Sequence, residues 1–192
     1  MFLELPLKLL SVLGVLVAAC CLTAATLAYP GGFDWNRDYI STLLRGPAGP
    51  SRTLADVGVL FFCVSLGGVF WRLARVFDIA KSSQFVKIGG VGSMVYAALT
   101  ITPMHDLMVT ISLVFLVVAV LALLRALQAD GEVVFFTIGC LCLLILIASA
   151  MVYYTGVFVS VLPWAQRASF GLLTVLLLCL DWAFPRTSPS ES

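Results

Sequence analysis

The chain has 192 residues, of which 61% are hydrophobic and only 11% are charged, and its formal net charge at pH 7 is +1. Soluble domains carry about 25% charged residues, so this composition, with a mean hydropathy of +1.10, excludes a soluble enzyme and predicts a membrane protein. It also argues against a nucleic-acid partner, because binding phosphates requires clustered Lys and Arg residues, which the sequence lacks.

Six apolar segments are each long enough to cross a bilayer as a helix, which takes about 20 residues. The third segment is the weakest, because Lys87 lies near its start and Gly89, Gly90 and Gly92 lower its helix propensity. The pattern predicts an all-α, polytopic membrane helix bundle that forms a single domain over residues 1–186. Its six transmembrane helices are expected at 7–29, 54–76, 85–101, 104–127, 133–153 and 164–184.

The first segment has two interpretations. Lys8 before an apolar run, with small residues at Ala24 and Ala25, is typical of a cleaved signal peptide. The run is longer than the usual signal core of about 7 to 15 residues and ends at Tyr29, which favours a retained membrane anchor. At the other end, the Ser-, Pro- and Glu-containing residues 187–192 predict a disordered cytoplasmic tail.

Basic residues indicate the orientation of the bundle. Cytoplasmic loops of membrane proteins carry an excess of Lys and Arg. With six spans, seven of the 11 basic residues lie on the side of the two termini, so we expect both termini in the cytoplasm. These seven are Lys8, Arg72, Arg75, Lys81, Lys87, Arg125 and Arg186.

No ionisable residue falls near the centre of a predicted span. Asp56, Lys87, Arg125, Arg167 and Asp181 all lie within a turn or two of a span end. Proton pumps and ion carriers usually place a carboxylate or a histidine near the midplane. The sequence therefore disfavours both of these classes.

The connection between the first two spans, residues 30–53, is the richest in polar groups and is expected outside the cytoplasm. Asp34 as the N-cap and Gly46 after the last turn predict a short amphipathic helix over about 35–45. Such a helix would lie in the plane of the lipid head groups, so we expect it at the membrane interface.

This expected helix has two interpretations. In the first, it only seals the outer end of the bundle, and Asp34 and Arg37 are ordinary helix neighbours three residues apart. Alternatively, Asp38 and Ser41, also three apart and hence on one face, point into a polar pocket.

Residues 102–106 open the fourth span on the same side of the membrane. Thr102 as N-cap, Pro103 at the first helical position and Asp106 in the first turn form a helix-start signature. His105 is the only histidine of the chain. The positive end of a helix disfavours a second positive charge, so we expect a neutral imidazole that is either a base or hydrogen-bond partner for a ligand, or a satisfied structural residue.

A third group of polar residues follows at the last outer turn. Tyr153, together with Tyr154 and Trp164, forms either an interfacial aromatic belt or part of a ligand site. Arg167 is expected to pair with Asp38 or Asp106, or to hold a lipid phosphate or carboxylate. The candidate ligand-binding residues are therefore Asp34, Arg37, Asp106, Tyr153 and Arg167.

The sequence predicts no metal site and no other cofactor. One histidine cannot supply two or three His ligands, and all six cysteines fall inside predicted spans, where they behave as small hydrophobes. Gly90 and Gly92 lack the context of a nucleotide-binding loop and indicate close helix packing instead.

Three residues could together catalyse acyl transfer. Ser41 would be the nucleophile, His105 the base, and Asp38 the group that orients the imidazole. Asp106 is not expected to orient His105, because adjacent residues point about 100 degrees apart on a helix. No nucleophile-elbow motif surrounds Ser41, so the spacing leaves catalysis open.

Two short motifs carry a family resemblance. Asp-Tyr-Ile-Ser at 38–41 and Pro-x-His-Asp at 103–106 resemble an uncharacterised prokaryotic DUF family of six-helix membrane proteins and, more loosely, the Frag/DRAM/Sfk group. The resemblance covers about residues 7–184 and implies a prokaryotic plasma membrane and roles in lipid-anchor remodelling, lipid distribution or autophagy-linked membranes. It carries over Asp38, Ser41 and His105, whereas Thr-Leu-Leu after Ser41 departs from the expected Ser-x-Leu-Gly turn.

Three functions remain in view. The first is an integral membrane protein whose extracytoplasmic interfacial polar pocket binds a lipid or other amphiphile. The second is a membrane-embedded lipid-modifying enzyme, and the third is a structural or assembly subunit of a membrane complex. The expected partner is membrane lipid, with a second copy of the chain or a complex subunit as a further candidate.

Overall fold

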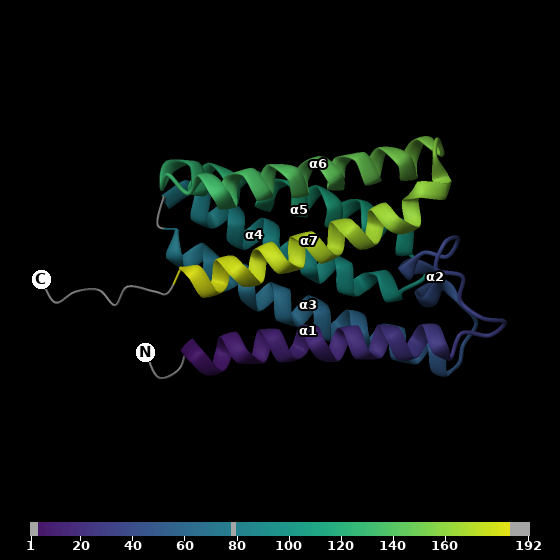
Figure 1. Cartoon of the computed structure of the whole chain (residues 1–192). Helices are drawn as coiled ribbons and strands as arrows, with labels where there is room; N and C mark the ends of the chain where they lie inside the picture. Colours follow the sequence, from purple (N-terminus) through teal and green to yellow (C-terminus); the bar gives the residue numbers. More distant parts are fainter. Residues whose placement is uncertain (1–3, 78–79, 185–192) are drawn as a thin grey trace, which may run out of the picture.

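The computed structural model describes residues 4–77 and 80–184, which form seven α-helices and no strand (Figure 1). Six of the helices are long and apolar enough to cross a membrane, so the chain is an integral membrane protein of the predicted all-α class. They are α1 (Glu4–Leu27), α3 (Pro50–Val76), α4 (Ala80–Ala98), α5 (His105–Ala129), α6 (Val133–Thr155) and α7 (Leu162–Ala183). The other elements are the short α2 (Ile40–Arg45) and two 3₁₀ turns, η1 (Leu99–Ile101) and η2 (Val159–Val161).

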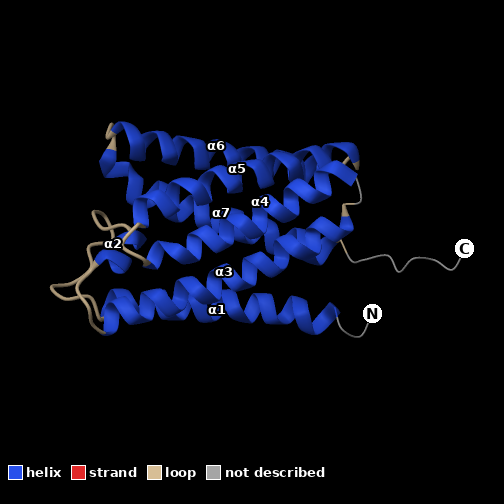
Figure 2. Ribbon diagram, turned by 180° about the vertical axis from the view of Figure 1, so that it is seen from behind, coloured by secondary structure: helices blue, strands red, loops and turns tan. Residues whose placement is uncertain are grey.

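The long helices run side by side and alternate in direction, so that both ends of the chain lie at one end of the bundle (Figures 1 and 2). At the opposite end lie α2 and the connections from α1 to α3, from α4 to α5 and from α6 to α7. Helix α1 packs along α3, α3 along α4, α4 along α5, and α6 along α7. This arrangement agrees with six predicted spans and with termini that share one side.

Glycines let α4 approach its neighbours closely. A Cβ atom on Gly89 would lie 2.9 Å from the main-chain oxygen of Phe115, and one on Gly92 would lie 2.7 Å from the Phe115 ring. A Cβ atom on Gly90 would collide with the ring of Phe70 on α3. The prediction that these glycines serve helix packing is therefore confirmed.

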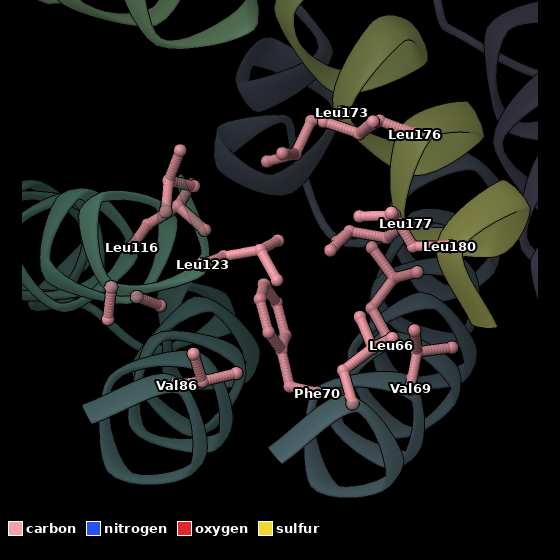
Figure 3. Close-up of a cluster of buried hydrophobic side chains, with 14 of the residues drawn as sticks. Leu66, Val69, Phe70, Val86, Leu116, Leu123, Leu173, Leu176, Leu177 and Leu180 are labelled. Atoms are coloured by element: carbon pink, nitrogen blue, oxygen red, sulfur yellow. The ribbon is translucent and has the colours of Figure 1, made fainter. Parts of the chain in front are cut away.

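The tightest apolar packing lies in the half of the bundle nearer the two termini. Phe70 and Leu73 on α3, Val86 on α4 and Leu127 on α5 are completely buried there. Figure 3 shows side chains of α3, α4, α5 and α7 meeting in this region, with the ring of Phe70 directed toward Leu123. Contacts among these four helices, which are distant in sequence, hold this half together.

One ion pair is buried in this half. The guanidinium of Arg72 on α3 donates two hydrogen bonds to the carboxylate of Asp181 on α7, at 2.9 and 2.7 Å, and a third to the hydroxyl of Ser11 on α1, at 2.8 Å. The two charged side chains are only 12% and 3% exposed. The bidentate geometry satisfies both charges and joins three helices at positions far apart in the chain.

Two predicted helix starts are wrong. The prediction placed Thr102 as the N-cap of the fourth span, but α5 begins at His105, and the Thr102 hydroxyl instead donates to the main-chain oxygen of Leu99 at 2.7 Å. The prediction also placed Asp34 as the N-cap of a helix over 35–45. Helix α2 begins only at Ile40, because the carboxylate of Asp34 accepts from the amide of Asn36, two residues on, which forms a local turn.

The end of α2 also differs from the prediction. Gly46 follows the last turn as predicted, but its backbone, with φ −60° and ψ 169°, is extended rather than left-handed, so any residue could adopt it.

The expected disordered tail at 187–192 lies outside the described residues.

Candidate functional site

A cavity of about 280 Å³ lies inside the bundle at the α2 end, and we call it the central cavity. Every one of the six long helices contributes to its wall, and α2 contributes Ile40, Ser41 and Leu44. Binding sites of helix bundles are commonly built between the helices in this way. The cavity adjoins the apolar core, and the two share Leu66, Leu116, Leu146 and Leu173.

The wall of the central cavity is amphipathic. Its largest component is apolar and consists of aliphatic and aromatic side chains from α3, α5, α6 and α7. Its polar residues are uncharged apart from the capacity of the one histidine to take a proton. They are Tyr39, Ser41, Ser93, Thr100, His105, Ser112, Ser149, Tyr153, Tyr154, Gln166, Ser169 and Thr174.

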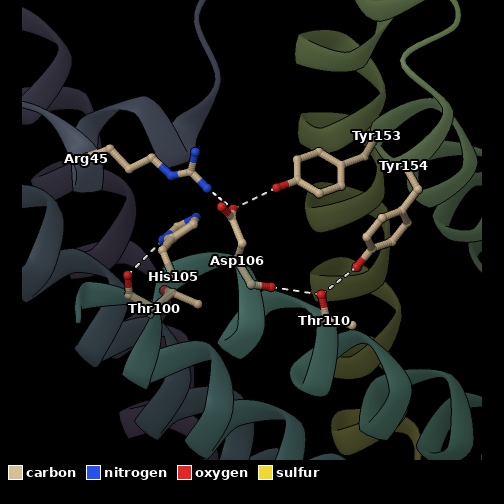
Figure 4. Close-up of polar contacts among 7 residues, drawn as sticks. All are labelled: Arg45, Thr100, His105, Asp106, Thr110, Tyr153 and Tyr154. Carbon is tan, nitrogen blue, oxygen red and sulfur yellow. Dashed lines mark hydrogen bonds and ion pairs between the residues drawn. The ribbon is translucent and has the colours of Figure 1, made fainter. Parts of the chain in front are cut away.

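His105 is the most distinctive polar group of this wall. It is the first residue of α5, and its side chain is buried, with a residue exposure of 8%. Its Nδ1 atom lies 2.8 Å from the main-chain oxygen of Thr100 (Figure 4). Because a carbonyl can only accept, Nδ1 carries the proton, which leaves Nε2 of the neutral ring as an acceptor or base. Within the described residues, the bond of Nδ1 is the one hydrogen bond of the ring, so Nε2 stays available to a ligand.

Helix α2 covers the central cavity and is tied to α7. The amide of Ile40 donates to Gln166 Oε1 at 3.3 Å, which leaves the amide nitrogen of Gln166 as an available donor. Leu43 and Leu44 are buried against α1 and α3. Ser41 lies on the cavity side of α2 and is half-buried, and no hydrogen bond joins it to His105 in the described part of the chain.

Two pairs of serines join neighbouring helices in the cavity wall. Ser112 on α5 donates to the main-chain oxygen of Ser93 on α4 at 2.9 Å. Ser149 on α6 and Ser169 on α7 have their hydroxyl oxygens 3.0 Å apart. Each pair satisfies polar groups within an apolar bundle and so fixes the spacing of two helices beside the cavity.

Asp106 lies on the rim of the bundle, outside the cavity wall. Its carboxylate pairs with Arg45 of α2 and accepts from the hydroxyl of Tyr153 of α6 at 2.8 Å (Figure 4). The hydroxyls of Thr110 and Tyr154 lie 2.7 Å apart in the same figure. The Arg45 and Asp106 side chains are 48% and 66% exposed, so their pairing stabilises the fold by only about 0 to 1 kcal/mol.

Arg167 binds main-chain oxygens rather than a carboxylate. Its guanidinium donates to the carbonyl oxygen of Trp35 and, at 2.8 Å, to that of Asp38. The same group lies 4.8 Å from the centre of the Trp35 ring and 5.4 Å from that of Trp164. Within the described residues Arg167 forms no ion pair with the carboxylate of Asp38 or Asp106, because the loop turns its carbonyl groups toward α7.

The remaining loop residues interact with one another. The carboxylate of Asp38 accepts from the amide of Asp34 at 2.8 Å, and Arg37 Nε lies 3.7 Å from Asp34 Oδ2 in an exposed pair three residues apart. Of the eight predicted site residues, only Ser41, His105 and Tyr153 line the cavity. The five that do not line it are Asp34, Arg37, Asp38, Asp106 and Arg167.

Sequence reasoning missed Gln166 and the two serine pairs. Serine is common on transmembrane helices, where its hydroxyl usually bonds to the carbonyl four residues earlier, as Ser149 and Ser169 also do here. The signal that could have found them is the position of Ser112 and Ser149 on otherwise apolar helices. Among the described residues, no three His, Cys, Asp or Glu side chains lie close enough to hold a metal ion.

No protein-family model, curated protein or solved structure matches the chain. The geometry of the central cavity is therefore the basis for assigning a function.

Proposed function

We propose that the protein binds a lipid or other amphiphile in the central cavity. The observation that carries this proposal is the amphipathic wall, in which His105 and Gln166 offer unpaired hydrogen-bonding atoms while leucines surround the deeper part. A hydrocarbon chain gains free energy from contact with apolar side chains, and a polar head gains it from the two polar groups.

The proposal includes an orientation in the membrane. The α2 end faces away from the cytoplasm, since basic residues such as Arg72, Arg75 and Arg125 lie toward the end of the bundle that carries the termini. Trp35 and Tyr39 anchor the α2 region in the head-group layer, where amphipathic rings are favoured. A lipid could then enter from the outer leaflet without crossing the bilayer.

Filling the cavity tests the proposal. Replacing Ala150, which lines the cavity, with phenylalanine is expected to reduce the lipid that remains bound after purification by tenfold or more, because the ring occupies the space of the ligand. The matched control is Ala148→Phe, two residues earlier on the exposed face of the same helix. Native mass spectrometry measures bound lipid, and circular dichroism checks the fold of both variants. Equal bound lipid in the two folded variants would refute the proposal.

A second candidate function is hydrolysis or transfer of a lipid acyl group. It is favoured by the bond between Nδ1 of His105 and Thr100, which leaves a basic Nε2 in the same cavity as Ser41. In this reaction Nε2 takes the proton of the Ser41 hydroxyl, the serine oxygen attacks the ester carbonyl, and the alcohol leaves with that proton. Water then releases the fatty acid. Thr100, rather than Asp38, orients the imidazole.

The test of this second candidate is the fate of 1-monooleoylglycerol incubated with the purified protein. If the protein is an enzyme, Ser41→Ala is expected to abolish release of oleic acid, by at least 10³-fold for loss of a nucleophile, while monooleoylglycerol still binds. Release at the same rate from the Ser41→Ala variant, or none from the wild-type protein, would exclude catalysis by Ser41 and leave the binding function intact.

A further inference from the structure

Among the residues that the structure describes, none of the four charged types Asp, Glu, Lys and Arg lines the central cavity. An ionised head group inside it would lose its hydration without gaining a partner, and the cost of burying an unpaired charge far exceeds that of burying a hydroxyl. The composition of the wall therefore bears on the head group of the ligand.

Two arginines near this end of the bundle already have polar partners. Arg45 pairs with Asp106, and Arg167 donates to the main-chain oxygens of Trp35 and Asp38. To bind a phosphate or a carboxylate, Arg45 would first have to lose its partner, whereas Arg167 keeps one buried N–H, at Nε, without a partner in the described part of the chain. Neither of them lines the cavity.

One carboxylate lies close to the wall without belonging to it. Asp56 is one turn before Val59, the first lining residue of α3, and its Oδ1 atom is buried without a hydrogen-bond partner in the described part of the chain. When ionised, it disfavours an anionic head group nearby, and Arg52, four residues earlier, partly offsets its charge. Because the same charge attracts a cation, an experiment also has to test a cationic head group.

The groups that remain available match an uncharged head. His105 is more than nine-tenths buried, and its Nε2 accepts a hydrogen bond, while the amide nitrogen of Gln166 donates one. Ser41 adds a hydroxyl that does both. A hydroxyl group, which donates one bond and accepts others, can satisfy this set of partners.

The volume restricts the rest of the ligand. The cavity of about 280 Å³ lies at the small end of ligand pockets, which span about 300 to 1,000 Å³. It therefore suits the head and the first part of one hydrocarbon chain better than two chains. The apolar wall formed by Leu66, Leu116, Leu146 and Leu173 fits such a chain.

We propose that the central cavity selects a single-chain lipid with an uncharged, hydroxyl-bearing head, the chemistry of a long-chain alcohol or a monoacylglycerol. This selectivity rests on the proposed lipid-binding function and specifies its ligand class. It excludes lipids whose head carries a phosphate, a carboxylate or an amine.

Ligands that share one chain and differ only in the head test this inference. Oleyl alcohol and 1-monooleoylglycerol have uncharged heads, whereas oleyl sulfate is permanently anionic and oleyltrimethylammonium is permanently cationic. We expect the wild-type protein in detergent to bind each uncharged ligand at least tenfold more tightly than either charged one, as measured by competition in native mass spectrometry. Dioleoylglycerol, with two chains and an uncharged head, is expected to bind at least tenfold more weakly than monooleoylglycerol.

The Ala150→Phe and Ala148→Phe variants distinguish a failure of the ligand selectivity from a failure of lipid binding itself. Equal or tighter binding of a charged ligand, lost only in Ala150→Phe, would overturn the head-group selectivity while lipid binding stands. Equal binding of dioleoylglycerol, lost in the same variant, would overturn the restriction to one chain. Failure of all ligands to bind, or binding that Ala150→Phe does not reduce, would overturn the lipid-binding function as well.

Discussion

Replacing Asp181 with alanine is expected to lower the free energy of unfolding by about 3 to 5 kcal/mol. The substitution leaves the guanidinium of Arg72 buried and without the carboxylate that accepts two of its hydrogen bonds. An uncompensated buried charge is the main cost, because the hydrogen bond to Ser11 alone cannot replace the lost ion pair. Unfolding by titration of SDS into detergent micelles, followed by circular dichroism, measures the change.

A double substitution separates the cost of the orphaned charge from the net value of the pair. In Arg72→Met with Asp181→Leu both charges are removed, and the apolar side chains fill a similar volume, so we expect stability close to that of the wild-type protein. The account would be contradicted if the double variant lost as much free energy of unfolding as Arg72→Met and Asp181→Leu lose together when made singly. An Asp181→Ala protein that unfolds at the wild-type SDS fraction would contradict it as well.

Phe70 is the second position with a large expected effect. Its side chain is completely buried in the core between α3, α4 and α5 (Figure 3). Phe70→Ala is expected to cost about 3 to 5 kcal/mol, because burial of the ring is lost and a cavity remains. The same SDS titration measures this loss, and Phe61→Ala, at an exposed position of α3, serves as the control that changes stability little.

Gly90 gives this prediction a sharper test. In the wild-type protein an alanine at position 90 would collide with the Phe70 ring, so Gly90→Ala is expected to cost about 1 to 3 kcal/mol. In the Phe70→Ala background the ring is gone and only the Cβ of residue 70, 2.6 Å from the added Cβ, still opposes it, so the cost of Gly90→Ala is expected to fall clearly without vanishing. Equal costs of Gly90→Ala in both backgrounds would show that the two positions are not coupled as the packing implies.

Much of the fold could be predicted because hydropathy over about 20 residues decides which segments suit a membrane. Helix ends were less predictable, since they depend on local hydrogen bonds that compete with one another. Thr102 and Pro103 form a typical helix-start pattern, yet Thr102 bonds back to Leu99 and α5 begins two residues after the proline. Asp34 likewise closes a turn of its own, which delays the start of α2.

The candidate site was partly predictable for a related reason. His105 and Ser41 stood out as polar residues at the start of a helix and on an amphipathic segment, and both line the cavity. Contacts between distant residues gave no such signal. Arg72 and Asp181 are 109 residues apart in the chain, and Gln166 meets Ile40 across 126 residues, so only the packing of α3 and α7 with their neighbours reveals these partners.

The uneven distribution of buried contacts has a mechanical consequence. The buried ion pair and the completely buried leucines fasten α1, α3, α5 and α7 near the chain ends, whereas the opposite half surrounds a cavity and is covered by a six-residue helix. Local opening of the less tightly packed half costs less free energy than unfolding of the whole bundle. We therefore expect displacement of α2, which breaks the contacts of Ile40 with Gln166 and of Arg45 with Asp106, to cost less free energy than separation of the long helices.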